Sequence, residues 1–191
     1  MGKDTLLNNL LRDEDIKKVC GGQLHKAISH TTRSKRTNEQ YDVDYYFTDP
    51  HTFHSMKDND MFVETTSYEI ETENRIYEYG MSKREIEDNE FVITIVNPYG
   101  LEAFLKSEYA HNVVSILIDR DLKDCCLSYL TRDENANPYA LAERILRDKA
   151  DFDPLLASEG VVDYSVQNDN YIKGYEQLKR IVMEELGDLI D

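Results

Sequence analysis

Residues 91–100, Phe91-Val92-Ile93-Thr94-Ile95-Val96-Asn97-Pro98-Tyr99-Gly100, carry the clearest structural signal in the chain. The first six side chains are β-branched or aromatic, which is typical of a short buried strand. Asparagine followed by proline commonly opens a helix, and apolar residues continue at Leu101, Phe104 and Leu105 with helical spacing. The segment therefore predicts a buried strand that leads through a tight turn into a helix.

The same alternation of strand and helix continues to the end of the chain. Short apolar runs predict further strands, and segments with helical spacing predict further helices: strands at 113–118 and 161–167, and helices at 121–130, from 138 through 146 and at 171–190. Apolar strands that alternate with helices are typical of a parallel sheet covered on both faces. Because ligands of such sheets bind beyond the carboxyl ends of the strands, we expect functional residues there.

The first half of the chain predicts shorter elements. A leucine stripe at residues 6–11 predicts a helix, and Pro50 begins another. Ser82 and Glu85 match the spacing of a capping box, which predicts a helix from residue 83. The expected strands in this half are 24–30, 45–47, 61–66 and 76–79.

The composition is that of a soluble, globular protein of one domain. The chain has 191 residues, 40% of them hydrophobic and 31% charged, which is enough for a substantial core. Its formal net charge of −16 repels nucleic acid, and no apolar run is long enough to span a membrane. Its three cysteines, two of them adjacent, are a poor disulfide framework. We therefore expect a cytoplasmic protein that binds neither nucleic acid nor membranes.

One window of this acidic chain, residues 16–38, contains no acidic residue at all. Its last third, Ser29-His30-Thr31-Thr32-Arg33-Ser34-Lys35-Arg36, places two arginines three residues apart behind a run of hydroxyls. Guanidinium groups and hydroxyls donate hydrogen bonds that match phosphate oxygens. The window therefore indicates a pocket for a small, highly charged anion. The alternative is a solvated loop that balances the local charge.

The segment Gly2-Lys3-Asp4-Thr5, followed by the leucine stripe, has the form of the end of a phosphate-binding loop. In such a P-loop, backbone N–H groups at a helix N-terminus and a lysine surround the phosphates. The cysteines and histidines show no spacing typical of metal ligands. The sequence thus offers a second candidate anion site and no metal site built from these residues.

Taken in order along the chain, these pieces resemble the guanylate kinase family. The basic loop 29–36, Glu39 and the run Asp44-Tyr45-Tyr46-Phe47 are similar to the family's signature in residue type and spacing. The resemblance continues through the segments 62–64, 79–83, 92–100, 130–147 and 168–169. It implies a P-loop kinase-type three-layer α/β fold with a central parallel sheet. It also implies one domain over residues 1–191, with a β-rich acceptor-binding subdomain at about 30–82 and a helical lid at about 130–140.

The resemblance implies transfer of a phosphoryl group from ATP to GMP or dGMP, giving ADP and GDP or dGDP. Glu64 would accept hydrogen bonds from N1–H and the exocyclic amine of guanine, a donor pair that adenine lacks. Matched residue by residue, the GMP site consists of Ser29, Arg33, Arg36, Tyr45 and Tyr79 around the phosphate, with Glu64, Met81 and Asn97 on the side of the base.

On the donor side, the resemblance implies an ATP site and a set of cations around the transferred phosphoryl group. Mg²⁺ would bridge the donor phosphates, held mostly through water and phosphate oxygens. Phosphoryl transfer needs mainly positioning and charge neutralisation. The partners would be nucleotides, and the chain a monomer or homodimer. The ATP-binding residues would be Gly2, Lys3, Asp4, Thr5 and Asn168, and the catalytic residues Lys3, Arg33 and the lid arginines Arg132 and Arg144.

The start of the chain departs from the family's pattern. The glycine expected five residues before Gly2, and the strand before it, do not occur in this sequence. We therefore expect either that the recorded start is internal to a longer natural protein or that ATP-dependent catalysis has been lost. Asp4 also stands where the family usually has a metal-binding hydroxyl.

The base side departs from the pattern as well. Met81 stands where the family has a hydroxyl that contacts the base, while Asn97 and Ile95 replace aspartates. The segment between Glu64 and Tyr79 carries an acidic insertion. The leading hypothesis is thus a guanylate kinase with a divergent base site. The alternatives are a catalytically inactive GMP-binding or protein-binding module and a kinase for another nucleotide.

Overall fold

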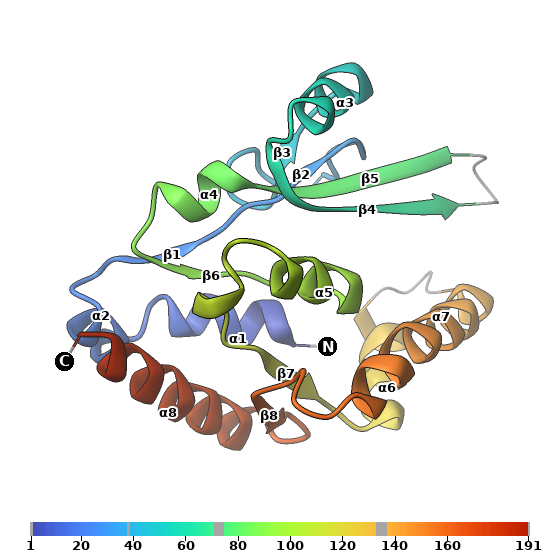
Figure 1. Cartoon of the computed structure of the whole chain (residues 1–191). Helices are drawn as coiled ribbons and strands as arrows, with labels where there is room; N and C mark the ends of the chain where they lie inside the picture. Colours follow the sequence, from blue (N-terminus) through green and yellow to red (C-terminus); the bar gives the residue numbers. More distant parts are fainter. Residues whose placement is uncertain (1, 38, 71–74, 133–136, 191) are drawn as a thin grey trace. The chain divides into compact units, whose positions relative to one another are not determined.

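The structure, a computed structural model, describes residues 2–37, 39–70, 75–132 and 137–190, without the side chains of residues 70, 132 and 190. Backbone packing divides the chain into two compact units (Figure 1). The terminal unit combines Met1–Gly22 with Val114–Asp191, and the central unit is Gln23–Val113. Both units contain parallel strand pairs and helices, so the predicted α/β class is confirmed. The predicted boundaries of the subdomain at 30–82 and of the lid at 130–140 stay predictions, and residues 133–136 of that lid lie outside the described residues.

In the terminal unit, a parallel pair of strands is accompanied by helices from both ends of the chain. Strand β7 (Ile116–Asp119) pairs with β8 (Tyr164–Gln167) over their full length. Helix α8 packs against α1, α2 and β8, so the first and last helices lie together (Figure 1). The helices are α1 (Lys3–Leu10), α2 (Glu14–Val19), α6 (Leu122–Arg132), α7 (Pro138–Ala157) and α8 (Tyr171–Ile190).

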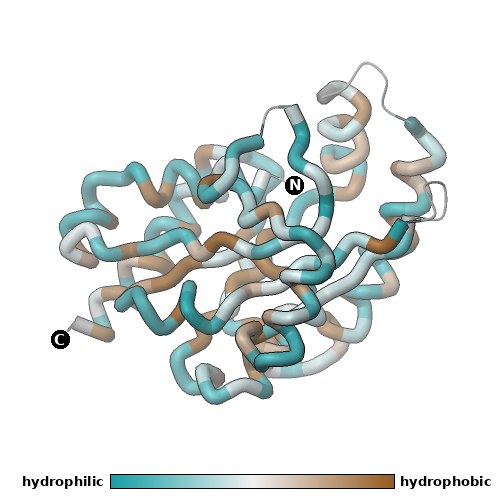
Figure 2. The backbone as a smooth tube through the Cα atoms, turned by 90° about the horizontal axis from the view of Figure 1, so that it is seen from above, coloured by the Kyte–Doolittle hydropathy of each residue, from teal (hydrophilic) through white to brown (hydrophobic). Residues whose placement is uncertain are grey.

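The predicted leucine stripe forms part of the core of the terminal unit. Leu6, Leu7 and Leu10 of α1 are buried, as are Leu178 and Ile181 of α8. Figure 2 shows hydrophobic residues alternating with hydrophilic ones along the chain, as helices with one buried face require. The sequence therefore predicts both of these helices from their apolar spacing, and α8 begins and ends at the predicted residues.

The central unit combines a short parallel pair with a mixed four-stranded sheet. Strand β1 (Leu24–Lys26) pairs in parallel with β6 (Phe91–Ile93). The sheet has the order β3-β2-β5-β4, formed by β2 (His30–Thr31), β3 (Tyr46–Phe47), β4 (Phe62–Ile70) and β5 (Arg75–Ser82). Its helices are α3 (Pro50–Asp58), α4 (Lys83–Glu87) and α5 (Pro98–Lys106), with a 3₁₀ turn at Ala110–Asn112.

A single carboxylate, Glu85, explains two departures from the predicted elements. Its Oε2 accepts a 2.8 Å hydrogen bond from the N–H of Ile28, so the predicted strand 24–30 is interrupted between β1 and β2. Ala27 N–H still donates to the carbonyl of Ile93, and β6 ends at that residue instead of continuing to 96. The parallel ladder therefore stops where Ile28 turns to the Glu85 carboxylate.

The helix predicted from residue 83 is confirmed, because α4 begins at Lys83, although the capping box expected at its start is not formed among the described residues. Ser82 takes the N-cap position of α4, but within the described residues its side chain makes no capping hydrogen bond. Glu85 instead accepts from the hydroxyl of Tyr46 at 3.0 Å and lies 3.1 Å from Nε2 of His25. Burial favours a raised pKa for Glu85, but the Ile28, His25 and Tyr46 contacts outweigh it and hold the pKa below its ordinary value. Burial and this carboxylate together raise the pKa of Tyr46 to about 12.

Two apolar clusters support the sheet of the central unit. Met81 is fully buried with Ala27 and Phe104. Phe53 of α3 is also fully buried and stacks on Phe62 of β4, with ring centroids 4.7 Å apart. Helix α3 is thus fixed to the sheet through an aromatic pair.

Gly80→Ala is expected to destabilise the fold. A Cβ atom at Gly80 would lie 2.9 Å from the ring of Phe62 and 3.2 Å from the carbonyl oxygen of Glu64. Overpacking of this kind costs about 1–3 kcal/mol of unfolding free energy. Gly187→Ala is the control, because its Cβ meets nothing within 4 Å and alanine favours the helix. Urea unfolding should show opposite signs for the two variants, and equal effects would contradict the predicted clash.

Candidate nucleotide site

The two sets of predicted nucleotide residues fall into different units. The central unit holds the residues assigned to GMP: Ser29, Arg33, Arg36, Tyr45, Glu64, Tyr79, Met81 and Asn97. The terminal unit holds those assigned to ATP and to the lid: Gly2, Lys3, Asp4, Thr5, Arg132, Arg144 and Asn168. The residues predicted to bind the acceptor nucleotide thus lie in the central unit, and those predicted to bind the donor nucleotide lie in the terminal unit.

Arg33 is a buried, firmly held cation of the central unit. Its side chain is only 9% exposed, and its guanidinium makes a bidentate pair with Glu39, with both N···O distances 2.8 Å. Nε donates to the hydroxyl of Tyr79 at 3.3 Å, and the guanidinium carbon lies 5.2 Å from the ring centroid of Tyr45. The Glu39 carboxylate raises the pKa of Arg33 further above its ordinary value. Arg33 is therefore a permanently charged donor in a fixed position.

Arg36 lies beside the same carboxylate but remains accessible. Its side chain is 75% exposed, and its Nη1 is 4.0 Å from Oε1 of Glu39. The backbone N–H of Arg36 donates to Oε2 of Glu39 at 2.8 Å. Both predicted arginines therefore contact Glu39, a residue of the family signature for which the sequence analysis predicts no role of its own.

Tyr45 and Tyr79 contact Arg33 and belong to a larger group of tyrosine rings. Tyr79 lies 5.8 Å from Tyr45 and 5.6 Å from Tyr68, in edge-to-face arrangements. Ser29 fixes the adjoining loop, because its carbonyl accepts a 3.0 Å hydrogen bond from Tyr46 N–H. The loop, rings and cations together present hydroxyl and guanidinium donors suited to a phosphate.

Glu64 lies on the same sheet as these rings. In the β4–β5 ladder, Glu64 pairs with Met81 and Thr66 pairs with Tyr79, so their side chains share one face. The Glu64 carboxylate accepts hydrogen bonds from the hydroxyl of Thr66 at 3.3 Å and from the backbone of Met81. Burial raises its pKa above the ordinary value. Glu64 is a half-buried carboxylate, and both Thr66 and Met81 are neutral donors. Such a carboxylate is well suited to accept hydrogen bonds from a ligand.

The structure places Met81 and Asn97 in structural roles. Met81 packs in the apolar cluster with Ala27 and Phe104. Asn97 caps α5, because its Oδ1 accepts the N–H of Gly100 at 2.8 Å, and its Nδ2 donates to the hydroxyl of Tyr68 at 2.6 Å. Their assignment to the GMP site stays a prediction. Tyr68, which the sequence did not single out, links β4 to the start of α5.

At the start of the terminal unit, Gly2 is the N-cap of α1 in a left-handed conformation with φ of 93°. Lys3 lies next to it with Nζ 3.3 Å from the carboxylate of Asp4, and both side chains are exposed, as is Thr5. Backbone N–H groups at a helix N-terminus and an accessible lysine are the ingredients of a phosphate site, while the oxygens of Asp4 and Thr5 are ligands suited to a cation beside it. The sequence predicts each of them from four residues.

Asn168 lies close to this helix start. It is buried at the end of β8, and its N–H donates to the carbonyl of Asp119 at 2.8 Å. A Cβ added to Gly2 would lie 2.9 Å from its Nδ2, and one added to Gly174 would lie 2.7 Å from its Oδ1. Two glycines therefore make room for this amide, and Asn168 lies beside Gly2, in the segment predicted to be the end of a phosphate-binding loop.

The lid arginines are less defined. Arg144 is exposed on α7 with Nε 3.5 Å from Asp148 one turn further on, as in an ordinary helix-surface ion pair. The side chain of Arg132 lies outside the described residues. Both lid assignments stay predictions.

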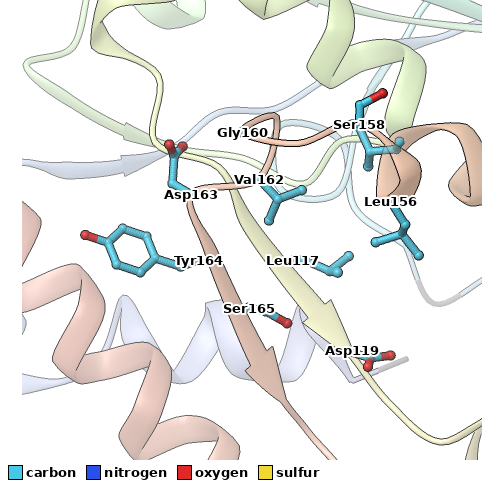
Figure 3. Close-up of a pocket in the computed structure, with 10 residues that line it drawn as sticks. Leu117, Asp119, Leu156, Ser158, Gly160, Val162, Asp163, Tyr164 and Ser165 are labelled. Atoms are coloured by element: carbon cyan, nitrogen blue, oxygen red, sulfur yellow. The ribbon is translucent and has the colours of Figure 1, made fainter.

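The terminal unit also contains a hollow of about 500 Å³ between the end of α7 and the β7–β8 pair (Figure 3). Leu117, Leu156 and Val162 provide apolar walls, with Asp119 at the end of β7. None of the predicted nucleotide residues lines it. The hollow is therefore no part of the candidate site.

The described residues form no metal-binding cluster, no disulfide and no membrane-spanning helix. Within the ranges given above, no three histidine, cysteine or acidic side chains group as a metal-binding cluster. The three cysteines are free thiols. No helix in the described part of the chain has the length and apolar character needed to cross a bilayer.

The fold defined by these elements is that of the P-loop kinases. The structure is similar to the crystal structure of guanylate kinase from Anaplasma phagocytophilum, with a TM-score of 0.63 and 22% identity over 96% of this chain and 81% of that chain. A family model described as guanylate kinase matches residues 1–185. The chain therefore belongs to the guanylate kinase family.

Curated relatives agree with this assignment. The guanylate kinase of Mycoplasma genitalium is 29% identical over 188 residues, which cover 97% of this chain and 72% of the relative. The guanylate kinase of Mycoplasmoides gallisepticum is 25% identical over 96% of this chain and 87% of its own length. A shorter match, 43% identical over 63 residues, is to the guanylate kinase of Haemophilus ducreyi and covers 33% of this chain and 28% of the relative.

Proposed function

We propose that this protein is an ATP-dependent guanylate kinase that phosphorylates GMP or dGMP. The observation that carries the proposal is the pair Arg33 and Arg36 around Glu39, beside Tyr45 and Tyr79, in a member of this family. These groups match the charge and the hydrogen-bonding needs of a monophosphate. The protein's partners in this proposal are nucleotides, and its location in the cytoplasm stays a prediction.

On the acceptor side, each group has one task. Arg36, Arg33 and the tyrosine hydroxyls bind the phosphate of GMP and orient it. Glu64 accepts the two N–H donors of guanine, for which its ionised form is required. In-line transfer without a covalent enzyme intermediate then depends on position and on charge neutralisation.

On the donor side, Lys3 and the N–H groups at the start of α1 bind the phosphates of ATP, with Asn168 beside them. Asp4 and Thr5 would offer oxygen ligands to Mg²⁺, since this ion is usually bound through one or two protein groups together with water and phosphates. When bound, it supplies neutralisation of phosphate charge. Arg132 and Arg144 would add positive charge near the transferred group.

The test is ADP formation from ATP and Mg²⁺ with GMP, dGMP, AMP, CMP and UMP supplied in turn. We expect activity with GMP and dGMP, and its loss when EDTA removes the metal. GMP binding without turnover would favour an inactive binding module. Turnover with a different monophosphate would assign the divergent base side to that nucleotide.

The affinity for GMP should depend on pH through Glu64. Its raised pKa means that the protonated form, which cannot accept both guanine donors, appears already above the ordinary titration range of a glutamate. The KM for GMP should therefore rise as pH falls, approaching about tenfold per unit below that pKa. Measurement of KM between pH 4.5 and 8 checks this in the wild type.

Glu64→Gln provides the comparison for the pH series. It should raise the KM for GMP at pH 8 and remove most of the acid dependence, because the titrating group is gone. Its folded state should be at least as stable as the wild type, since folding no longer buries a charge. A wild-type profile identical to that of the variant would contradict the role of Glu64.

A further inference from the structure

We propose that Glu39 is a positioning residue that holds both phosphate-binding arginines in their working orientation. The proposal rests on the proposed function, because it concerns the acceptor phosphate of that reaction. Glu39 itself is not expected to touch the nucleotide: its side chain is only 16% exposed and its oxygens are occupied by Arg33 and by the backbone of Arg36.

The hydrogen bonds of Arg33 show how firmly it is held. A guanidinium has five N–H donors. Among the described residues, Nη1 donates to Glu39 and to the carbonyl of Ser34, Nη2 donates to Glu39, and Nε donates to Tyr79. One N–H of Nη2 is thus left for a ligand. Arg33 can offer a phosphate one hydrogen bond and its charge, but not a bidentate contact while Glu39 is in place.

Arg36 is complementary to this arrangement. Its backbone is tied to the same carboxylate through the 2.8 Å bond from its N–H, while its guanidinium remains largely exposed. Its fork is therefore available for a bidentate phosphate contact from an anchored backbone. The geometry assigns the bidentate contact to Arg36 and a single, oriented contact to Arg33.

The charges of the cluster favour a role for Glu39 in positioning the arginines over competition between Glu39 and the phosphate. Two arginines and one glutamate leave the cluster with a net positive charge, so a phosphate is still attracted. The Arg33 guanidinium also lies 5.2 Å from the Tyr45 ring and 5.7 Å from the Phe47 ring, so its face is fixed by packing as well. If Glu39 instead occupied the phosphate's own place, its removal would improve GMP binding.

The experiment compares Glu39→Gln and Glu39→Asp with the wild type, using the KM for GMP, the KM for ATP, kcat, and the inhibition constant of guanosine, which lacks the phosphate. Glu39→Gln should raise the KM for GMP about tenfold, the scale of one charge-assisted contact, and leave the guanosine constant and the KM for ATP near wild type. Glu39→Asp keeps the carboxylate, so its KM for GMP should lie between those of the wild type and Glu39→Gln. Glu102→Gln, on an exposed helix pair with Lys106, is the matched control.

The outcomes separate the hypotheses. A KM for GMP that is unchanged or lowered in Glu39→Gln overturns the proposal, and a lowered value identifies Glu39 as a competitor. Parallel weakening of guanosine and GMP also overturns it, because the defect would then be general. If Glu39→Gln does not fold by circular dichroism, the same comparison in Glu39→Asp decides. Failure of the wild type to phosphorylate GMP is a separate result that concerns the proposed function.

Discussion

Arg36→Ala is expected to raise the KM for GMP by about 10- to 150-fold, the scale of a lost charge-assisted phosphate contact. The reason is that Arg36 is the exposed member of the arginine pair, while Arg33 has most of its donors committed. Because the side chain of Arg36 contributes little to packing, the variant should fold normally. Steady-state kinetics and calorimetric titration with GMP measure the effect.

Arg84→Ala is the control for this substitution. Arg84 is an exposed arginine of the same unit, paired with Asp88 one helical turn away. Loss of such a surface pair should change the KM for GMP by no more than about twofold. If Arg36→Ala bound GMP as well as the wild type, the assignment of the acceptor site would be wrong.

Phe53→Ala should cost about 3–5 kcal/mol of unfolding free energy, because a fully buried ring leaves a cavity behind. Phe53 is the contact through which α3 stacks on Phe62, and the ring of His30 meets Phe62 edge-to-face with centroids 5.5 Å apart. The loss should therefore be concentrated in the central unit. Hydrogen exchange should speed up in β4 and β5 while amides of α8 remain protected.

Leu146→Ala provides the control for the loss of apolar volume. Leu146 lies on α7 and is 70% exposed, so its replacement by a good helix former should change stability by less than about 0.5 kcal/mol. Equal effects of the two substitutions would contradict the aromatic contact described for α3. Uniform acceleration of exchange in both units would contradict its confinement to the central unit.

Most elements of the fold were predictable because their signals are local. Apolar spacing placed α8 at its observed ends, and the Asn97-Pro98 pair placed the start of α5, where Asn97 does accept the N–H of Gly100. The strand ends were not predictable, because β1 and β6 stop where Ile28 donates to Glu85, a residue distant in sequence. The same carboxylate is occupied by Ile28 and Tyr46 and forms no capping box with Ser82 among the described residues, although the predicted helix does begin at Lys83.

The candidate site divides in the same way. Residue types and their spacing predict a role for Arg33 and Arg36, and the resemblance to the guanylate kinase family adds Glu64; all three predictions rest on side-chain chemistry. The conformation of the loop cannot be predicted from side-chain chemistry. For this reason neither the attachment of Glu39 to both arginines nor the bond between Asn97 and Tyr68 could be predicted. Spacing suggests which groups are available, while the fold decides which of them are already occupied.

The contacts of Glu85 have a consequence for how this sequence can change. One carboxylate serves the backbone of Ile28, the ring of His25 and the hydroxyl of Tyr46. Substitutions at positions 25, 46 and 85 are therefore epistatic: once the carboxylate is gone, losing either ring has a different effect from losing it alone. A variant that appears harmful in one background can be neutral in another, so these three positions are best altered together.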